Sequence, residues 1–585
     1  MKKNIHICLL ITLISSLGFA SPSDPVLFSN DAFKQAVEEN LGITDPTEAD
    51  MLNLTELYIY YNSAVTDING IGFATNLSGL YLFNTALTTL PAEIGNLTQL
   101  VDLIVYDNQL ISIPVEIGNL KNIHEISLIK NQLTTLPATI GNLPNLTYLE
   151  LDGNLLSTLP AELAEHPKLS ILGFSSNQIE TVPTWIAQLP NLKGLTIGNN
   201  LFTEVPVWIG DLTHLTSLDI RNMHLTTLPI HIANLTQLEN FSFTGNPLKR
   251  LPHWIGVLTN LKSLNLNDLQ LTRMPIWIGR LANLERLYFQ NNQITTLPVQ
   301  ISKLTKLLDL RFSHNKISTI PPTFRYLTNL IYLDASHNQI KYFPARLGKL
   351  RQLKQCFLGY NRLTRLPLTI GNLVNLEWLD VRENQLTTLP ATIGKLRHLK
   401  FLYLYKNKLA HLPPQIGALS KLSNLSLGHN QLTRLPTKMG NLTHLTSLNL
   451  DSNPLEILPS WVGNLTRLTT INLYNSQLAE LPFEIFNLSG LAHLHIQSNP
   501  FNTFFYCTQL PQLIERNINH LYYNNNSNLL TNDCSVDLAE LQIFTNHWLT
   551  TDCDVIYPYC NGADLTRNGV VDLFDYQSLT TIWMN

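Results

Sequence analysis

Eighteen prolines recur in this chain of 585 residues at a constant spacing of 23, from Pro91 to Pro482, with no insertion or deletion between them. A fixed period of this length is the signature of a solenoid, in which each repeat stacks on its neighbours. One repeat cannot bury its own apolar side chains, so the stack shares a single continuous core. The length alone would allow about four average domains, and the regular spacing argues against such a division.

The segment between prolines is well represented by residues 373–386, LVNLEWLDVRENQL. Its Leu-x-Leu part alternates with period two, which predicts a short strand with one buried face that pairs in parallel with the next repeat. An asparagine stands seventeen residues after the proline in fifteen of the eighteen repeats; Met223, Leu269 and Ser476 are the exceptions. We expect these amides to form an internal ladder that bonds backbone groups left free by a tight bend.

This pattern resembles the leucine-rich repeat in its 23-residue form, LPxxIGNLxxLxxLxLxxNxL, over roughly residues 50–505. It is similar in particular to the secreted leucine-rich repeat proteins of bacteria. The resemblance implies an α/β solenoid, a horseshoe with a long parallel β-sheet on its concave face and short helical or irregular segments on its convex side. Residues 28–37 have helical spacing, with Asn30 or Asp31 as N-cap, and resemble the N-terminal cap of such proteins.

The first twenty residues are typical of a secretory signal peptide. A basic start at Lys2 and Lys3 precedes an apolar run over residues 5–19 and small residues at the cleavage site. That run is short for a hydrocarbon core of ~30 Å, so we predict no membrane span. We therefore expect a secreted protein, extracellular or at the cell surface. The predicted organisation is a signal peptide (1–20), an N-terminal cap (21–50), the repeats (51–505), a C-terminal cap and linker (506–530) and a tail module (531–585).

The cysteines support export. Cys356 occupies a leucine position of a repeat, which predicts a buried thiol. Four others gather near the C-terminus, and four cysteines in an exported chain indicate two disulfides with three unranked connectivities. These four are Cys507, Cys534, Cys553 and Cys560. The short loop between Cys553 and Cys560 favours a disulfide between these two.

The tail module has a period of its own, because residues 536–549 match residues 571–584 at an offset of 35. Calcium prefers six to eight oxygen ligands, supplied by positions 1, 3, 5, 7, 9 and 12 of a loop with glycine at position 6. In the second copy Gly569 is at the turn, and the ligand positions hold Asp564, Thr566, Asn568, Val570 (through its carbonyl), Asp572 and Asp575.

Aspartate at position 12 and paired loop–helix segments make the tail resemble dockerin modules, which are EF-hand-like. Dockerins bind cohesins, so the resemblance implies a cohesin-like or cell-surface partner and a structural calcium ion. The first copy has Leu529 at position 1, which leaves calcium binding there open.

No pattern in the repeats indicates an enzyme: the sequence lacks a phosphate loop, an HExxH motif and a GxSxG motif. His493 and His495 should face the same way on one strand, but two ligands without a third favour surface histidines over a zinc site. The net charge of −5 argues against a basic field that would hold nucleic acid or anionic lipid. The sequence therefore predicts a binding protein without catalytic activity.

Residues that flank the strand leucines should point out of the concave sheet. Most repeats carry small polar residues there, whereas a middle stretch mixes aromatic residues with Arg and Asp, as protein-interface hot spots do. We predict that this stretch binds a protein partner; a carbohydrate-binding adhesin or polysaccharide-degradation-complex component, with a glycan on the same aromatic residues, stays the alternative. The predicted partner-binding residues are Arg286, Tyr288, Arg311, Tyr332, Asp334, Phe357, Trp378, Asp380, Arg382, Phe401, Tyr403 and Tyr405, together with Asp309.

A second row of large side chains should lie on the return side, two residues after successive prolines. Trp185, Trp208, His231, Trp254 and Trp277 occupy these positions. Neighbouring repeats would stack these rings into a stripe, either by packing on one another or as a second contact surface. The sequence leaves the ligand and the oligomeric state open.

Overall fold

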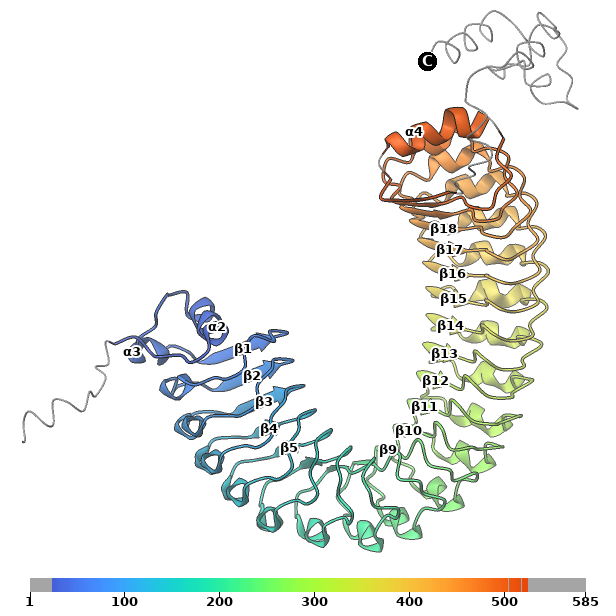
Figure 1. Ribbon diagram of the computed structural model, residues 1–585. Helices are drawn as coiled ribbons and strands as arrows, with labels where there is room; N and C mark the ends of the chain where they lie inside the picture. Colours follow the sequence, from blue (N-terminus) through green and yellow to red (C-terminus); the bar gives the residue numbers. More distant parts are fainter. Residues whose placement is uncertain (1–23, 503, 517, 524–585) are drawn as a thin grey trace, which may run out of the picture. The chain divides into compact units, whose positions relative to one another are not determined.

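The structure is a computed structural model that describes residues 24–502, 504–516 and 518–523. It divides into two compact units, the first ending at Arg362 and the second beginning at Leu363. In each unit, every regular turn of the chain contributes one short strand and one 3-10 helix (Figure 1). The predicted signal peptide, the calcium loop and Cys534, Cys553 and Cys560 lie outside the described residues.

All neighbouring strands within a unit pair in parallel, and partners are 23 residues apart, as in the row Leu287, Leu310 and Leu333. The first unit holds β1 (Glu56–Tyr60), β2 (Gly79–Phe83), β3 (Asp102–Tyr106), β4 (Glu125–Ser127), β5 (Tyr148–Glu150), β6 (Ile171–Gly173), β7 (Gly194–Thr196), β8 (Ser217–Asp219), β9 (Asn240–Ser242), β10 (Ser263–Asn265), β11 (Arg286–Tyr288), β12 (Asp309–Arg311), β13 (Tyr332–Asp334) and β14 (Gln355–Phe357). The second unit holds β15 (Trp378–Asp380), β16 (Phe401–Tyr403), β17 (Asn424–Ser426), β18 (Ser447–Asn449), β19 (Thr470–Asn472), β20 (His493–His495) and β21 (His520–Tyr522).

The return segments are 3-10 helices, and all except η1, which follows Gly70, begin directly after the repeated proline because its fixed φ suits a helix start. In the first unit they are η1 (Ile71–Phe73), η2 (Ala92–Asn96), η3 (Val115–Asn119), η4 (Ala138–Asn142), η5 (Ala161–Glu165), η6 (Thr184–Gln188), η7 (Val207–Asp211), η8 (Ile230–Asn234), η9 (His253–Val257), η10 (Ile276–Arg280), η11 (Val299–Lys303), η12 (Pro322–Tyr326) and η13 (Ala345–Lys349). In the second unit they are η14 (Leu368–Asn372), η15 (Ala391–Lys395), η16 (Pro414–Ala418), η17 (Thr437–Asn441), η18 (Ser460–Asn464) and η19 (Phe483–Asn487).

The core lies between the strands and the 3-10 helices. The central residue of each strand is buried, as Leu310 and Leu402 are, and so is the isoleucine of most IGN segments. Cys356 takes the central position of β14 and is fully buried, which confirms its predicted place in the core. Rows of apolar side chains on successive turns, most of them leucines, therefore form one apolar interior in each unit.

The asparagine ladder is confirmed. Asn315 is typical: its Nδ2 donates to the carbonyl of Phe289 in the preceding turn at 2.9 Å and to that of Phe312 in its own turn at 3.2 Å. Its Oδ1 accepts from the backbone N–H of Ile294 at 3.0 Å. Each amide thus joins two turns and satisfies backbone groups that the bend leaves without a partner.

The ladder adapts where asparagine is missing. Oδ1 of Asn246 accepts from the N–H of Met223 at 3.0 Å as well as from Leu225 at 2.9 Å, and Asn292 does the same for Leu269 and Leu271. At Ser476 the hydroxyl donates to the carbonyl that an asparagine would have reached. The asparagine of the following turn or the serine hydroxyl therefore replaces part of the missing hydrogen bonds, which explains why the fold continues through these substitutions.

α-Helices cover the ends of the described repeats. In the first unit, α2 (Asp31–Leu41) begins at the predicted N-cap Asn30, whose side chain accepts from the N–H of Phe33, and α3 (Glu48–Met51) follows. In the second unit, the π-helical η20 (Phe505–Gln509) leads into α4 (Leu510–Glu515). Phe33 and Val37 of α2 are fully buried, so this helix covers the apolar end of the first turns. Over the described ranges, no helix combines the length and the apolar character needed to cross a membrane.

Candidate protein-binding surface

The side chains on either side of each buried strand residue point out of the sheet, and we call the surface that they form the strand face. In β12, for example, Leu310 is buried while Asp309 and Arg311 are partly exposed. The predicted partner-binding residues all lie on or just after strands of this face. Those from Arg286 to Phe357 belong to the first unit and those from Trp378 to Tyr405 to the second, so they form two clusters that are described separately.

Arg311 is the centre of the first cluster. Its guanidinium donates to both carboxylate oxygens of Asp309, Nε to Oδ1 at 2.9 Å and Nη2 to Oδ2 at 2.8 Å. It also lies over the ring of Tyr332, 4.2 Å from the centroid, and near that of Tyr288 at 5.2 Å. Charge-assisted pairs and cation–π contacts of this kind hold a long side chain in one conformation. The first cluster is therefore organised before any partner arrives.

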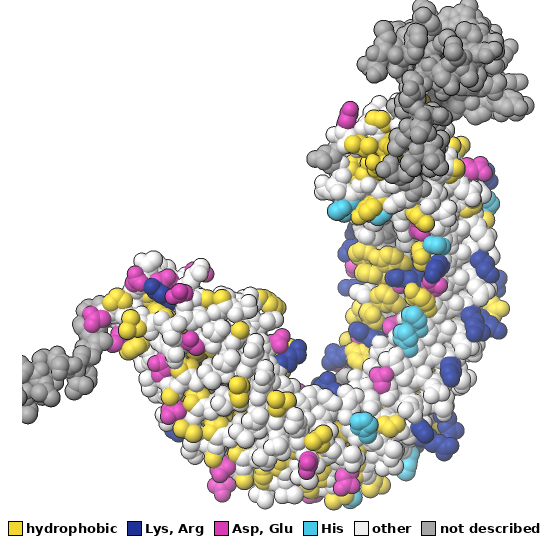
Figure 2. Space-filling model, in the orientation of Figure 1, with side chains coloured by type: hydrophobic (Ala, Val, Ile, Leu, Met, Phe, Trp, Pro, Cys, Tyr) yellow, Lys and Arg dark blue, Asp and Glu magenta, His cyan; other side chains and the backbone are white. Residues whose placement is uncertain are grey.

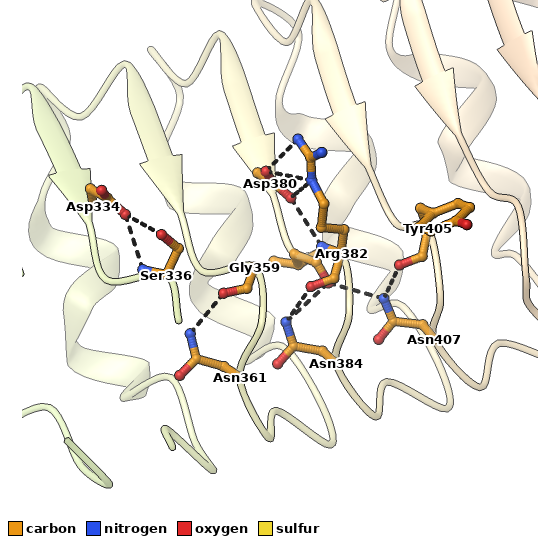
Figure 3. A network of polar contacts seen from close by, with 10 residues as sticks. Asp334, Ser336, Gly359, Asn361, Asp380, Arg382, Asn384, Tyr405 and Asn407 are labelled. Carbon is orange, nitrogen blue, oxygen red and sulfur yellow. Dashed lines mark hydrogen bonds and ion pairs between the residues drawn. The ribbon is translucent and has the colours of Figure 1, made fainter. Parts of the chain in front are cut away.

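Aromatic and acidic residues extend this cluster along the strand face. The rings of Tyr332 and Phe357 are 5.3 Å apart, and the hydroxyl of Tyr288 donates to Asp309 at 3.0 Å. Burial and the neighbouring Asp309 carboxylate raise the pKa of Tyr288 to about 12, so the phenol stays protonated at neutral pH. Asp334 accepts from both the N–H and the hydroxyl of Ser336 (Figure 3), and Arg286 is exposed at the edge.

The second cluster repeats the same chemistry around Arg382. Its Nε donates to Oδ2 of Asp380 at 2.8 Å (Figure 3), and its guanidinium lies 4.9 Å from the ring centroid of Tyr403. Trp378 packs on Phe401 at 4.4 Å and on Tyr403 at 5.5 Å. Beside them, the ring of Tyr405 meets His429 edge-on at 5.0 Å. Flat rings next to a fixed guanidinium can bury apolar partner side chains and bind carboxylates or carbonyls.

The structure also reveals an aromatic surface that sequence reasoning missed, at the N-terminal end of the first unit. The rings of Tyr58 and Tyr81 stack at 4.4 Å and those of Tyr60 and Phe83 at 5.0 Å, with Tyr106 next in line. We call these five residues on β1 to β3 the N-terminal platform. The Tyr-x-Tyr and Tyr-x-Phe pairs at 58–60 and 81–83 were the available signal, because they alternate as outward strand residues do.

The two histidines singled out in the sequence lie on β20. His493 and His495 face outward on β20, and the ring of His493 stacks on His520 at 4.6 Å. Burial and the two nearby imidazoles lower the pKa of His495. Within the described residues, no three His, Cys, Asp or Glu side chains are grouped to hold a metal ion.

The return-side row is not a stripe of stacked rings. Trp254 and Trp277 are buried against the repeats, whereas Trp185 and Trp208 are partly exposed and His231 is exposed. None of these five side chains makes a ring contact with another across the described turns. Their main role is to cover the apolar interior from the return side.

Comparison with known proteins agrees with this geometry. A family model described as a leucine-rich repeat region matches residues 341–435 and 392–468, and a leucine rich repeat model matches residues 282–340. No curated protein matches the chain in sequence.

Among solved structures, a leucine-rich repeat protein of Leptospira interrogans is 30% identical with a TM-score of 0.46, covering 73% of this chain and 97% of its own. The plant peptide hormone receptor RGFR1 in complex with RGF2 is 26% identical with a TM-score of 0.51, covering 78% and 84%. YopM from Yersinia enterocolitica shows the same fold at 23% identity and a TM-score of 0.50, covering 86% and 97%. Together with turns of 23 residues, one parallel strand per turn and the asparagine ladder, these matches identify the chain as a leucine-rich repeat protein.

Proposed function

We propose that this protein is a non-enzymatic scaffold that binds a partner protein through the strand face of its repeats. The observation that carries this proposal is the pair of clusters around Arg311 and Arg382, each with a bidentate or paired Asp–Arg contact and packed aromatic rings. Tyr, Trp and Arg dominate the energetics of protein interfaces because they bury a large area with few rotatable bonds.

Pre-organisation supports the proposal further. An interface loses affinity when flexible side chains must be fixed on binding, by about 0.5–1.5 kcal/mol for each one immobilised. Arg311 and Arg382 are already held by carboxylates and rings, so this cost is reduced. The structure of the similar receptor RGFR1 was solved in complex with RGF2, which agrees with a partner of peptide or protein character.

A pull-down from the native cell surface with the full chain tests the proposal. We expect Trp378→Ala combined with Tyr403→Ala to reduce recovery of the partner at least tenfold, because hot-spot truncations cost about 2 kcal/mol or more. Tyr342→Ala is the control, since Tyr342 is 58% exposed but lies outside the strands, between β13 and η13. Equal recovery by both variants would exclude the second cluster as the binding site.

A glycan ligand is the alternative, because stacked rings beside carboxylates also suit sugars. Rings on the strand face such as Trp378 and Phe401 favour this second candidate. A glycan array with the full chain separates the two candidates. Binding to a defined polysaccharide that is lost in Trp378→Ala would replace the protein partner by a carbohydrate.

We also propose that the chain is secreted after cleavage of residues 1–20 and tethered by a calcium-binding, dockerin-like tail. Secretion rests on the sequence of residues 1–20, and the calcium-binding tail rests on the sequence of residues 531–585. Titration calorimetry with calcium should detect at least one site that disappears in Asp564→Ala and persists in Asp552→Ala, a control outside the ligand positions. Retention of all calcium binding by Asp564→Ala would remove the tail from the proposal, and N-terminal sequencing of the exported protein tests the cleavage.

A further inference from the structure

We propose that the N-terminal platform, with the acidic residues beside it on β3 to β5, binds an extended lysine- or arginine-rich segment of a partner protein. This inference rests on the proposed function, because it assigns a partner chemistry to one end of the strand face. It concerns residues far in sequence from the two clusters around Arg311 and Arg382, so the surfaces can be tested independently.

The platform exists because the first three strands are longer than those that follow. β1, β2 and β3 have five residues each, whereas β4 to β14 have three. The added length gives each of the three strands one further outward residue, and these are Tyr60, Phe83 and Tyr106. Tyr58 is 44% exposed and Tyr60 is 53% exposed, so part of each ring is available to a ligand although each stacks on the ring of the next strand. Large aromatic residues in contiguous exposed rows mark interaction sites.

Carboxylates line the same face beside the rings. Glu125 on β4 lies directly opposite Asp102 on β3. On its other side, the neighbouring strand β5 carries Glu150, which is in register with Ser127 of β4. Burial and repulsion from these two carboxylates raise the pKa of Glu125. Within the described residues none of the three forms an ion pair. Like charges on adjacent strands destabilise a sheet, so a cationic partner would relieve repulsion that the free protein carries.

The platform itself contains an example of the contact that a cationic partner would make. Nζ of Lys130 lies over the ring of Tyr106, 5.1 Å from the centroid. A lysine or arginine of a partner can approach Tyr58 and Tyr60 in the same way, with a gain of about 0.5–1 kcal/mol for each exposed cation–π contact. The hydroxyls of Tyr58 and Tyr81 point to Glu56 and Asp102, which brings negative charge to the ring edges.

The net charge of the surrounding turns favours a positively charged partner. Residues 24–240 carry 23 acidic and 6 basic side chains, a net charge of −17. In Figure 2, acidic side chains outnumber basic ones over these turns. Such a field raises the association rate of cations and opposes nucleic acids and acidic glycans. An extended segment that alternates basic and small residues would point all of its basic side chains to one side, so that they can all face this surface.

A fluorescent peptide of alternating lysine and glycine, titrated against the full chain, tests the inference. We expect saturable binding that weakens about fivefold to tenfold in Tyr58→Ala with Tyr60→Ala, and by a similar factor in Glu125→Gln with Glu150→Gln. The same peptide with glutamate in place of lysine should not bind. Trp378→Ala is the control that leaves peptide binding unchanged, because Trp378 belongs to the second cluster.

Several outcomes would overturn the inference. Equal affinity for the lysine and glutamate peptides, or unchanged binding in the Glu125 and Glu150 variant, would exclude charge recognition. Unchanged binding in the tyrosine variant, with its thermal unfolding also unchanged, would exclude the platform. A salt-sensitive dimer in sedimentation, lost in the Glu125 and Glu150 variant, would make a second copy of this chain the occupant. If the natural chain does not bind the lysine peptide but still recovers its partner in the pull-down through Trp378, this inference is wrong and the proposed function stands.

Discussion

At the scale of single residues, the ladder asparagines connect successive turns more directly than the leucines do. Asn315 makes three backbone contacts with carbonyls and accepts from Ile294, all in buried surroundings. We expect Asn315→Ala to lower the free energy of unfolding by about 2–3 kcal/mol, because the buried N–H of Ile294 and the three carbonyls lose this partner. The measurement is thermal unfolding combined with amide exchange at Ile294.

Asn329→Ala is the matched control for that prediction. Its side chain also donates to a carbonyl of the preceding turn, that of Thr305 at 2.9 Å, but it is exposed, so water can replace the amide. We expect a loss below about 1 kcal/mol. Equal losses for the two variants would mean that burial of the ladder contributes nothing beyond an ordinary surface hydrogen bond.

The carboxyl group of Asp152 on the strand face makes stability depend on pH. Burial, and to a smaller degree Glu150 and Asp219, raise its pKa to about 7, although the N–H of Ser175 and the charge of Arg221 oppose the shift. The unfolded carboxyl releases its proton near pH 4. Between these values the folded state binds more protons than the unfolded state, so stability falls as pH rises from about 4 to about 7.

Asp152→Asn should remove this dependence, because the amide keeps an acceptor for Ser175 and carries no charge. At pH 8 we expect the variant to unfold at a higher temperature than the natural chain, with a free energy of unfolding that is greater by at most about 4 kcal/mol. Near pH 4 the free energies of unfolding of the two proteins should be equal. Thermal melts across this range are the measurement. A constant difference at all pH values would show that the effect of Asp152 is not one of ionisation.

At the scale of elements, glycine in the IGN segment lets neighbouring 3-10 helices approach each other. A Cβ on Gly279 of η10 would lie 2.6 Å from the carbonyl oxygen of Gln300 in η11, whereas one on Gly256 would find its nearest neighbour at 3.4 Å. We expect Gly279→Ala to cost about 1–3 kcal/mol, because the two helices must move apart, and Gly256→Ala to cost less than about 1 kcal/mol. Chemical denaturation of both variants tests this difference.

The sequence predicted the elements of the regular turns well because each position of the period has one physical task. The proline begins the helix, the leucines enter the core and the residues beside them point outward, so the positions of Arg311 and Tyr332 on the strand face followed from alternation. The pairing of Arg311 between two rings could not be predicted, because Tyr288 and Tyr332 come from turns on either side and side-chain conformation decides the contact.

The N-terminal platform was missed for a different reason. The period fails in the first turns, where Ile68 stands at the place of a proline. Without that marker, the length of β1 and β2 was not evident, and their five-residue extent creates the outward positions of Tyr60 and Phe83. Irregular turns at the end of a solenoid carry side-chain patterns that the repeat does not constrain.

At the scale of the molecule, the net charge of −5 hides a strong segregation. In the first unit, residues 24–240 carry a net charge of −17, whereas residues 241–362 carry 17 basic and 4 acidic side chains, a net charge of +13. The expectation from the total charge that the chain has no basic field is therefore wrong for residues 241–362. Side chains of like charge repel one another within each segment, and salt weakens this repulsion by screening.

One change of charge should have opposite effects in the two segments. Lys303 and Lys168 are both exposed, but Lys303 lies in the basic segment and Lys168 in the acidic one. We expect Lys303→Glu to raise the free energy of unfolding by about 0.5 kcal/mol in dilute buffer and Lys168→Glu to lower it by a similar amount. The measurement is thermal unfolding in dilute buffer and at about 0.3 M salt. At the higher salt concentration the Debye length is below ~8 Å, so interactions between distant charges are screened. If acidic and basic side chains were evenly mixed over the surface, the two variants would change the free energy of unfolding by the same small amount. Changes of opposite sign that disappear in salt therefore show that acidic and basic side chains are segregated along the first unit.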